Sequence, residues 1–157
     1  MSTRLHPWYV TGLVEGEGTF AVSFSQRRKL TVGIETRPSF SVTLHQRDLD
    51  ILKALRAYFR CGAIRYSRSD GTYKYEVRAI ADLAKKVVPH FEKYPLQGAK
   101  GDDFRKFAEI VRLVHAKHHL NPRYLRHIIE MAYSMNPSGK RRYKKDDLLR
   151  LLGEMKV

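Results

Sequence analysis

The 157-residue sequence contains a single cysteine, Cys61. One cysteine cannot form a disulfide within the chain, excludes a zinc site built from cysteines, and is typical of a reducing compartment. No apolar run approaches the length of a membrane-spanning helix, and the first seven residues lack the apolar core of a signal peptide. We therefore expect an intracellular protein that is not secreted and has no membrane partner.

Acidic residues are also scarce. The 16 Asp and Glu stand against 30 Lys and Arg, and the net charge of +14 indicates a polyanionic partner such as nucleic acid rather than a small-molecule substrate. The two asparagines and three glutamines favour a thermophilic source, so we expect the cytoplasm of a prokaryote, such as a thermophilic archaeon, or an organelle. With 43% apolar residues, the length suits one domain over residues 1–157.

The most informative segment is residues 10–18, which read VTGLVEGEG. In a helix, Gly12 and Gly16 would lie on one face, where another backbone could approach closely. Glu15 and Glu17 would lie at the C-terminal end of that helix, whose dipole disfavours negative charge unless a cation offsets it. The pair is compatible both with solvated carboxylates and with a metal site.

Hydrophobic periods predict the remaining elements. Residues 20–25 and 31–43 alternate as half-buried strands, and two further strands flank Asp70-Gly71, a two-residue hairpin signal. Helical periods follow at residues 49–59, 80–91, 104–114, 124–134 and 146–155. The order is αββαββα with additional C-terminal helices, which predicts an α+β domain with one antiparallel sheet.

One face of this sheet is predicted to be apolar. Its inward residues are Phe20, Val22, Phe24, Phe40, Val42, Ile64, Tyr75 and Val77. The other face mixes Arg and Lys with Ser and Glu. It comprises Ser23, Ser25, Arg27, Glu35, Arg37, Ser39, Ser41, Arg65, Ser67, Lys74, Glu76 and Arg78. Such polarity suits a solvated sheet, and it equally suits strands that read base edges in the DNA major groove.

Residues 10–18 resemble the LAGLIDADG motif of homing endonucleases, with glutamate in place of both aspartates. Further stretches resemble that family in the same order, namely FSVT, RDLDIL and GAI at residues 40–43, 47–52 and 62–64, YPLQGAK at residues 94–100 and MNPSGKR at residues 135–141. The resemblance implies a metal-dependent endonuclease that hydrolyses both strands of a long, near-palindromic double-stranded DNA site. Because the motif occurs once, we expect a homodimer whose Gly12 and Gly16 faces pack together.

The same resemblance assigns the site residues. Glu17 and the Gly16 carbonyl would hold Mg²⁺ or Mn²⁺, with Ca²⁺ supporting binding without cleavage. Glu15 is the second acid and is expected to order neighbouring backbone, while Lys100 would be a catalytic cation near the cleaved phosphate. One position departs from the family pattern, because the apolar Leu44 stands where the family often has a glutamine that organises water.

A basic run at residues 140–145 adds further expected DNA contacts. It contains Lys140, Arg141 and Arg142, and five cations in six residues suit contacts with phosphates better than a solvated loop. The alternative function is a non-catalytic nucleic-acid binder on the same scaffold, either an intron RNA maturase or a transcriptional regulator. The two acids and Lys100 favour catalysis, whereas Leu44 keeps the alternative open.

Overall fold

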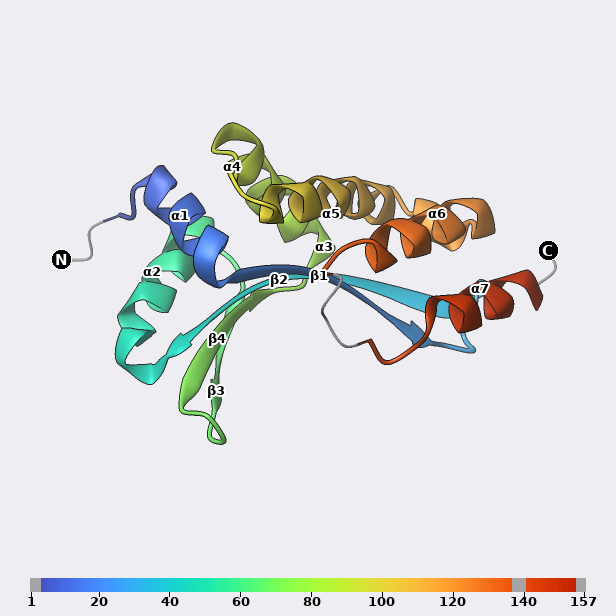
Figure 1. Ribbon diagram of the computed structural model, residues 1–157, viewed down its shortest axis with the longest axis horizontal. Coiled ribbons are helices and arrows are strands. Elements are labelled where there is room, and N and C mark those ends of the chain that lie inside the picture. The colour runs from blue at the N-terminus through green and yellow to red at the C-terminus, as the bar shows by residue number, and fades with distance from the viewer. Residues whose placement is uncertain (1–3, 137–140, 155–157) are drawn as a thin grey trace.

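The computed structural model describes residues 4–136 and 141–154. The fold is the predicted α+β arrangement (Figure 1). Its elements, in chain order, are α1 (Pro7–Glu17), β1 (Gly18–Gln26), β2 (Ile34–His45), η1 (Gln46–Asp48), α2 (Leu49–Phe59), β3 (Ala63–Ser67), β4 (Thr72–Val77), α3 (Ile80–Asp82), η2 (Leu83–Val87), α4 (Val88–Lys93), α5 (Lys100–His115), η3 (His118–Leu120), α6 (Pro122–Tyr133) and α7 (Lys145–Glu154).

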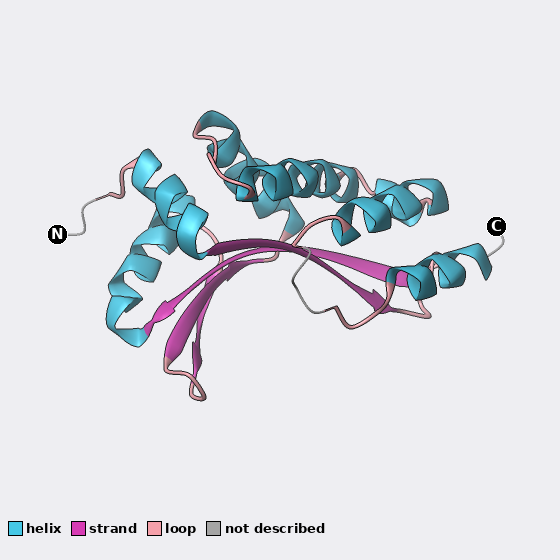
Figure 2. Cartoon of the chain, in the orientation of Figure 1, coloured by secondary structure: helices cyan, strands magenta, loops and turns pink. Residues whose placement is uncertain are grey.

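The four strands form one antiparallel sheet in the order β1-β2-β4-β3. Gly18 pairs with Val42 across β1 and β2, and Phe40 pairs with Val77 across β2 and β4. Helices α4, α5 and α6 lie on one side of the curved sheet, and its other side faces away from them (Figure 2). The sheet therefore has one face that can be packed in a core and one face that can meet a partner.

The apolar face of the sheet packs against the helices through a cluster of aromatic rings. The ring of Phe20 lies 5.3 Å from Phe40, 5.3 Å from Phe91 and 5.1 Å from Phe107, measured between ring centroids. Pairs at such distances contribute about 0.5–1.5 kcal/mol each beyond their burial. Because these rings come from β1, β2, α4 and α5, the cluster fixes the sheet against the helical layer.

Two turns differ in detail from the sequence prediction. Strand β2 begins at Ile34 rather than at residue 31, because Gly33 takes a positive φ of 71° and ends the preceding turn. In the second hairpin Ser67 pairs with Thr72, so residues 68–71 form the turn instead of the predicted pair Asp70-Gly71 alone. Gly71 still has a positive φ of 64°, which is the property that the hairpin signal detected.

The predicted helix at residues 80–91 is interrupted. It divides into α3, the π-helical turn η2 and α4, and Pro89 lies in the first turn of α4. Proline has no amide hydrogen to donate to the preceding turn, and a widened turn absorbs the missing bond. The apolar period nevertheless continues, since Leu83, Val87 and Phe91 are all buried.

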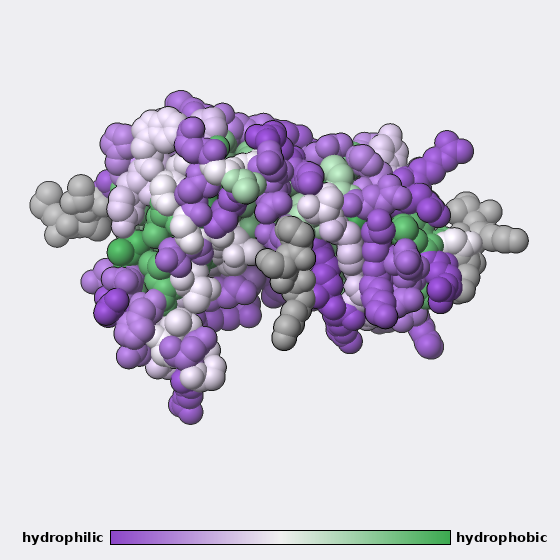
Figure 3. Space-filling model, in the orientation of Figure 1, coloured by the Kyte–Doolittle hydropathy of each residue, from purple (hydrophilic) through white to green (hydrophobic). Residues whose placement is uncertain are grey.

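Hydrophilic side chains cover much of the molecular surface in the view of Figure 3. In the two described ranges, no helix has the length and apolar character that crossing a membrane requires.

Candidate functional site

Helix α1 ends abruptly where the chain passes into β1. The amide of Gly18 donates to the carbonyl of Val14 and takes an extended conformation, so helix and strand meet at this residue. A Cβ at position 18 would lie 2.5 Å from the side chain of Val14. Glycine is therefore required here by the close contact, and the junction sets the direction in which Glu17 projects.

The other face of α1 is open. A Cβ built on either Gly12 or Gly16 would meet no atom within 4 Å, as far as the described residues extend. Trp8 and Tyr9, on the same helix, are among the large apolar side chains that remain exposed. These two glycines are thus not explained by packing within the described chain, in contrast to Gly18.

Glu15 orders neighbouring backbone, as expected for the second acid. Its Oε1 accepts hydrogen bonds from the amides of Gln97 at 2.6 Å and Gly98 at 3.0 Å. Charge-assisted bonds of this kind are stronger than neutral ones. The contact holds the loop before α5 against the end of α1, although Glu15 and Gln97 are 82 positions apart.

Lys100 also reaches the end of α1, from the first residue of α5. Its Nζ donates to the carbonyl of Val14 at 2.9 Å and to the carbonyl of Gly18 at 2.5 Å. Burial lowers the pKa of Lys100, and the nearby charges of Glu15 and Glu17 oppose that shift. Sequence reasoning missed this role: the ammonium satisfies carbonyls at a helix end, where a cation is favoured by the dipole.

Glu17 is the last residue of α1 and is exposed. Among the described residues, no hydrogen bond or ion pair engages its carboxylate. The carboxylate of Glu17 and the backbone carbonyl of Gly16 are hard oxygen donors, which suit Mg²⁺ or a similar cation. No group of three His, Cys, Asp or Glu comes together within the ranges that the structure describes. Further ligands would therefore have to come from water, a phosphate or a second chain.

Ten of the twelve side chains predicted for the polar sheet face lie on the strands and share one face. The other two, Arg27 and Arg78, lie one residue beyond the ends of β1 and β4 and contact Glu35 and Glu76 on that face. The register places Ser23 opposite Arg37, Ser41 opposite Glu76 and Lys74 opposite Arg65, so side chains of the same orientation run across all four strands. Seven of the eight predicted inward positions are buried, and the eighth, Ile64, is half-buried. This separation of faces confirms the alternation read from the sequence.

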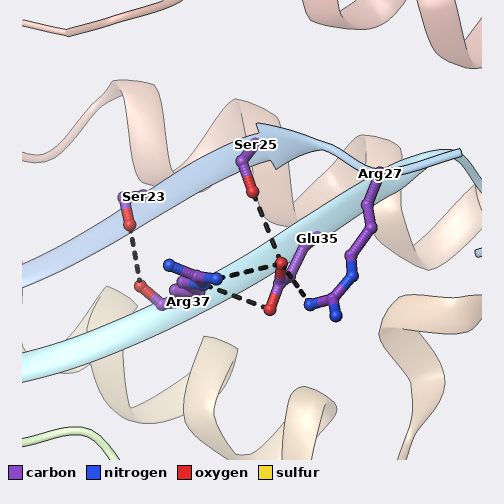
Figure 4. Close-up of polar contacts among 5 residues, drawn as sticks. All are labelled: Ser23, Ser25, Arg27, Glu35 and Arg37. Atoms are coloured by element: carbon purple, nitrogen blue, oxygen red, sulfur yellow. Dashed lines mark hydrogen bonds and ion pairs between the residues drawn. The ribbon is translucent and has the colours of Figure 1, made fainter.

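The two acids on this face are already engaged by cations of the same chain. Glu35 Oε2 accepts from Arg27 Nη1 at 2.9 Å and from Arg37 Nη2 at 3.2 Å (Figure 4). The hydrogen bond from Arg37, together with that from Arg27, lowers the pKa of Glu35 despite partial desolvation. Glu76 likewise lies 3.4 Å from Lys74 Nζ and 3.8 Å from Arg78 Nε.

The basic run after α6 behaves differently from the prediction. Arg141 points inward: Nη1 donates to the Val22 carbonyl at 2.5 Å, Nη2 donates to the Ala132 carbonyl, and the guanidinium stacks on the Tyr133 ring. Burial lowers its pKa. Arg141 is therefore a structural residue that covers the free edge of β1. Arg142 is exposed, and Lys140 lies outside the described residues.

A polar cluster under α1 was also missed by sequence reasoning. The Thr11 hydroxyl donates to the Tyr94 carbonyl at 2.9 Å, so it accepts from His90 Nε2 at 3.1 Å, and the Tyr58 hydroxyl donates to His90 Nδ1 at 2.9 Å. Burial lowers the pKa of His90 to about 4, so the ring is neutral near pH 7 and its Nδ1 accepts from the Tyr58 hydroxyl. The cluster ties α1 to α2 and α4.

Comparison with known proteins identifies the family. Residues 10–111 match the family model described as LAGLIDADG endonuclease. The chain belongs to the LAGLIDADG endonuclease family. "Probable intron-encoded endonuclease 3" of Neurospora crassa is 34% identical over 134 residues, which cover 85% of this chain and 25% of that protein. "Homing endonuclease I-ApeII" of Aeropyrum pernix is 27% identical over 150 residues, which cover 92% of this chain and 88% of that protein.

Solved structures of homing endonucleases share the fold. The homing endonuclease I-TnaI superposes with a TM-score of 0.84 at 37% identity, over 98% of this chain and 100% of that one. I-SmaMI, bound to an uncleaved DNA target in the presence of calcium ions, superposes with a TM-score of 0.85 at 30% identity, over 96% of this chain and 49% of that one. The chain spans between about a quarter and a half of the Neurospora crassa and Mycosarcoma maydis relatives.

Leu44 is the clearest departure from the LAGLIDADG pattern. It lies on β2 opposite Tyr73, two residues beyond Val42, which pairs with Gly18 where α1 ends. Its side chain is half-buried against the core. Gln46, a glutamine close by in sequence, accepts instead from the Tyr66 hydroxyl at 3.1 Å. An apolar side chain at this position would have to leave the ordering of water to other groups.

Proposed function

We propose that the chain is one subunit of a homodimeric homing endonuclease that hydrolyses both strands of a long, near-palindromic double-stranded DNA site with Mg²⁺ or Mn²⁺. The observation that carries this proposal is the exposed carboxylate of Glu17, at the end of a helix whose Gly12 and Gly16 face is open. The names of the relatives, homing or intron-encoded endonucleases, support it. We further propose an intron-encoded, intracellular protein of a prokaryote or an organelle.

Each residue at the end of α1 has a separate task in this proposal. Glu17 and the Gly16 carbonyl would hold the divalent cation, which when bound polarises the scissile phosphate and activates water. Glu15 anchors the loop before α5, and Lys100 holds the carbonyls of Val14 and Gly18. An ammonium has three hydrogens, so Lys100 would retain one for a phosphate oxygen in the transition state.

The proposed dimer follows from the open face of α1. Two copies of a helix with glycines four residues apart can approach closely, and each copy would bring one Glu17 to one DNA strand. The match covers the whole of the I-TnaI chain, whereas I-SmaMI is about twice as long as the matched region. The polar sheet faces of the two subunits would then bind successive major-groove segments, with the exposed Arg142 near phosphates. Lys140, which lies outside the described residues, is proposed from the sequence alone to contact phosphates as well.

Leu44 favours one other candidate, a non-catalytic nucleic-acid binder on the same scaffold, either an intron RNA maturase or a transcriptional regulator. Such a protein would keep the charged sheet face and would not depend on Glu17. The two candidates therefore differ in what happens when the charge of Glu17 is removed.

The experiment uses a supercoiled plasmid that carries the uninterrupted insertion locus, because a homing enzyme's target is the locus without its insertion. Wild-type protein, Glu17→Gln and the matched surface variant Glu130→Gln are incubated with Mg²⁺ to measure cutting. Binding is measured by gel shift, both in Ca²⁺ and without a divalent metal. We expect Glu17→Gln to cut slower by orders of magnitude and to bind metal-free DNA at least as well, because a charge near the phosphate is lost. If Glu17→Gln cut the plasmid at the wild-type rate, the proposed metal-dependent mechanism would be refuted and the non-catalytic candidate would be favoured.

A further inference from the structure

The two carboxylates of the polar sheet face are less exposed to solvent than the cations around them. The side chain of Glu35 is 22% exposed, whereas Arg27 is 52% and Arg37 is 49% exposed. Glu76 is 15% exposed, between Lys74 and Arg78 at 49% each. A partner approaching this face would therefore meet the cations first and the carboxylates beneath them.

The geometry around Glu35 restricts how Arg37 can point. Arg37 Nε lies 3.1 Å from Glu35 Oε1, and Nη2 donates to Oε2 at 3.2 Å (Figure 4). The carboxylate therefore binds the edge of the guanidinium that Nε and Nη2 form. The outer edge of the guanidinium, formed by Nη1 and the second N–H of Nη2, has no partner among the described residues. Two parallel N–H groups at that edge match the O6 and N7 acceptors of guanine.

We propose that Glu35 is a specificity-determining positioning residue, which holds Arg37, with Arg27 beside it, in the orientation that reads the guanine of a G·C base pair. The inference rests on the proposed DNA-binding function and deepens it by naming the base pair under this part of β2. Glu35 acts through the arginines and does not itself touch the base.

The physical reason is the loss of conformational freedom. A free arginine on a sheet surface samples many rotamers and can reach any nearby phosphate or base acceptor, so it adds affinity without selectivity. When a carboxylate holds the guanidinium, the same side chain presents its free N–H groups in one position and one orientation. Glu35 also offsets part of the positive charge, which weakens binding to DNA of any sequence.

The second cluster provides a graded comparison within the same face. The cation-to-carboxylate distances at Glu76 are 3.4 and 3.8 Å, longer than the 2.9 to 3.2 Å at Glu35. Glu76 therefore orients its cations less firmly. Removing its charge should change electrostatics as much as the same change at Glu35 and change selectivity less.

The test is selection of bound duplexes from a randomised library in Ca²⁺, followed by sequencing. It compares wild type, Glu35→Gln, Glu76→Gln and Glu130→Gln, the last an exposed glutamate on α6 with the same change of charge. We expect the wild-type protein to select one long site that contains a G·C pair at a fixed position and at the mirror position of the second half-site. In Glu35→Gln, the preference for G·C at these two positions should fall about tenfold. Glu76→Gln should lose less, and Glu130→Gln should retain the wild-type profile.

Arg37→Lys gives a second, independent measurement, because lysine keeps the charge and lacks the fork. It should lose the same G·C preference as Glu35→Gln, and thermal unfolding should show that both remain folded. A sequence-selective protein whose profile is unchanged by Glu35→Gln or Arg37→Lys would overturn this inference and leave the proposed function intact. Wild type that selects no sequence would refute the proposed function itself.

Discussion

The ammonium of Lys100 lies 2.5 Å from the carbonyl oxygen of Gly18, across 82 positions of the sequence. The bond joins the start of α5 to the point where α1 ends and β1 begins. Because Glu17 directly precedes Gly18, any movement of this junction moves the proposed metal ligand. Lys100 is thus placed to influence cleavage through the position of Glu17 as well as through its own charge.

Lys100→Met tests this relationship. The variant keeps the aliphatic stem and removes the side-chain donor to the Gly18 and Val14 carbonyls, of which Val14 still accepts from the Gly18 amide. The free energy of unfolding should therefore fall by about 1–3 kcal/mol. Plasmid cleavage should slow while gel-shift affinity in Ca²⁺ is retained. Lys106→Met is the control on the same helix, since Lys106 donates a single, longer bond of 3.3 Å to the Ser134 carbonyl. Equal cleavage rates for wild type and Lys100→Met would show that the junction does not need the ammonium.

Gly12→Leu tests the proposed dimer. The structure shows open space around position 12, and leucine favours a helix over glycine by about 1 kcal/mol, so the subunit itself should fold. The bulky side chain should separate the subunits, and light scattering should report half the wild-type mass. Gly153→Leu, at another helical glycine in open space, should leave the mass unchanged. A monomeric wild type with intact cleavage would refute the homodimer.

His90 predicts a loss of stability in mild acid. Its pKa is about 4 in the folded protein and about 6.5 when unfolded, so the unfolded chain binds the proton first as the pH falls. The free energy of unfolding should therefore decrease between pH 7 and pH 5, by about 2 kcal/mol from this group. Urea unfolding at both pH values measures the loss, and His90→Gln should reduce it. A His90 ring resonance that titrates near pH 6.5 in the folded protein would contradict the prediction.

Arg141 and Arg142 are adjacent and should behave in opposite ways. Arg141→Ala removes donors from the Val22 and Ala132 carbonyls and should lower the free energy of unfolding by about 2–3 kcal/mol. Arg142→Ala should change stability by less than about 0.5 kcal/mol and weaken binding of all DNA sequences alike. Denaturant unfolding and gel shifts with several duplexes separate the two effects. Similar stability for both variants would mean that Arg141 is not a structural residue.

Local patterns in the sequence were sufficient to predict the sheet and the separation of its two faces. Alternation at Phe20, Val22 and Phe24 places one face in the core, and a strand slipped by one residue would expose all three. The helical period survived even through the π-helical turn before Pro89, because the burial of Leu83, Val87 and Phe91 does not depend on the type of turn.

Contacts between distant segments were what the sequence could not supply. Arg141 reaches Val22 across 119 positions, and nothing in a basic run distinguishes a guanidinium that turns inward from those that face solvent. The capping role of Lys100 and the buried His90 depend in the same way on how helices pack. The pairing of Glu35 with Arg37, by contrast, was open to prediction, because residues two apart on a strand share a face.

The most direct test of the account is a mixed dimer with one wild-type subunit and one Glu17→Gln subunit, joined by a linker or purified through two different tags. If each Glu17 serves one DNA strand, this dimer should nick the supercoiled target plasmid at close to the wild-type rate. It should produce almost no linear DNA, whereas the wild-type dimer linearises the plasmid. Linear product at the wild-type rate from the mixed dimer would contradict the claim that one carboxylate cuts one strand.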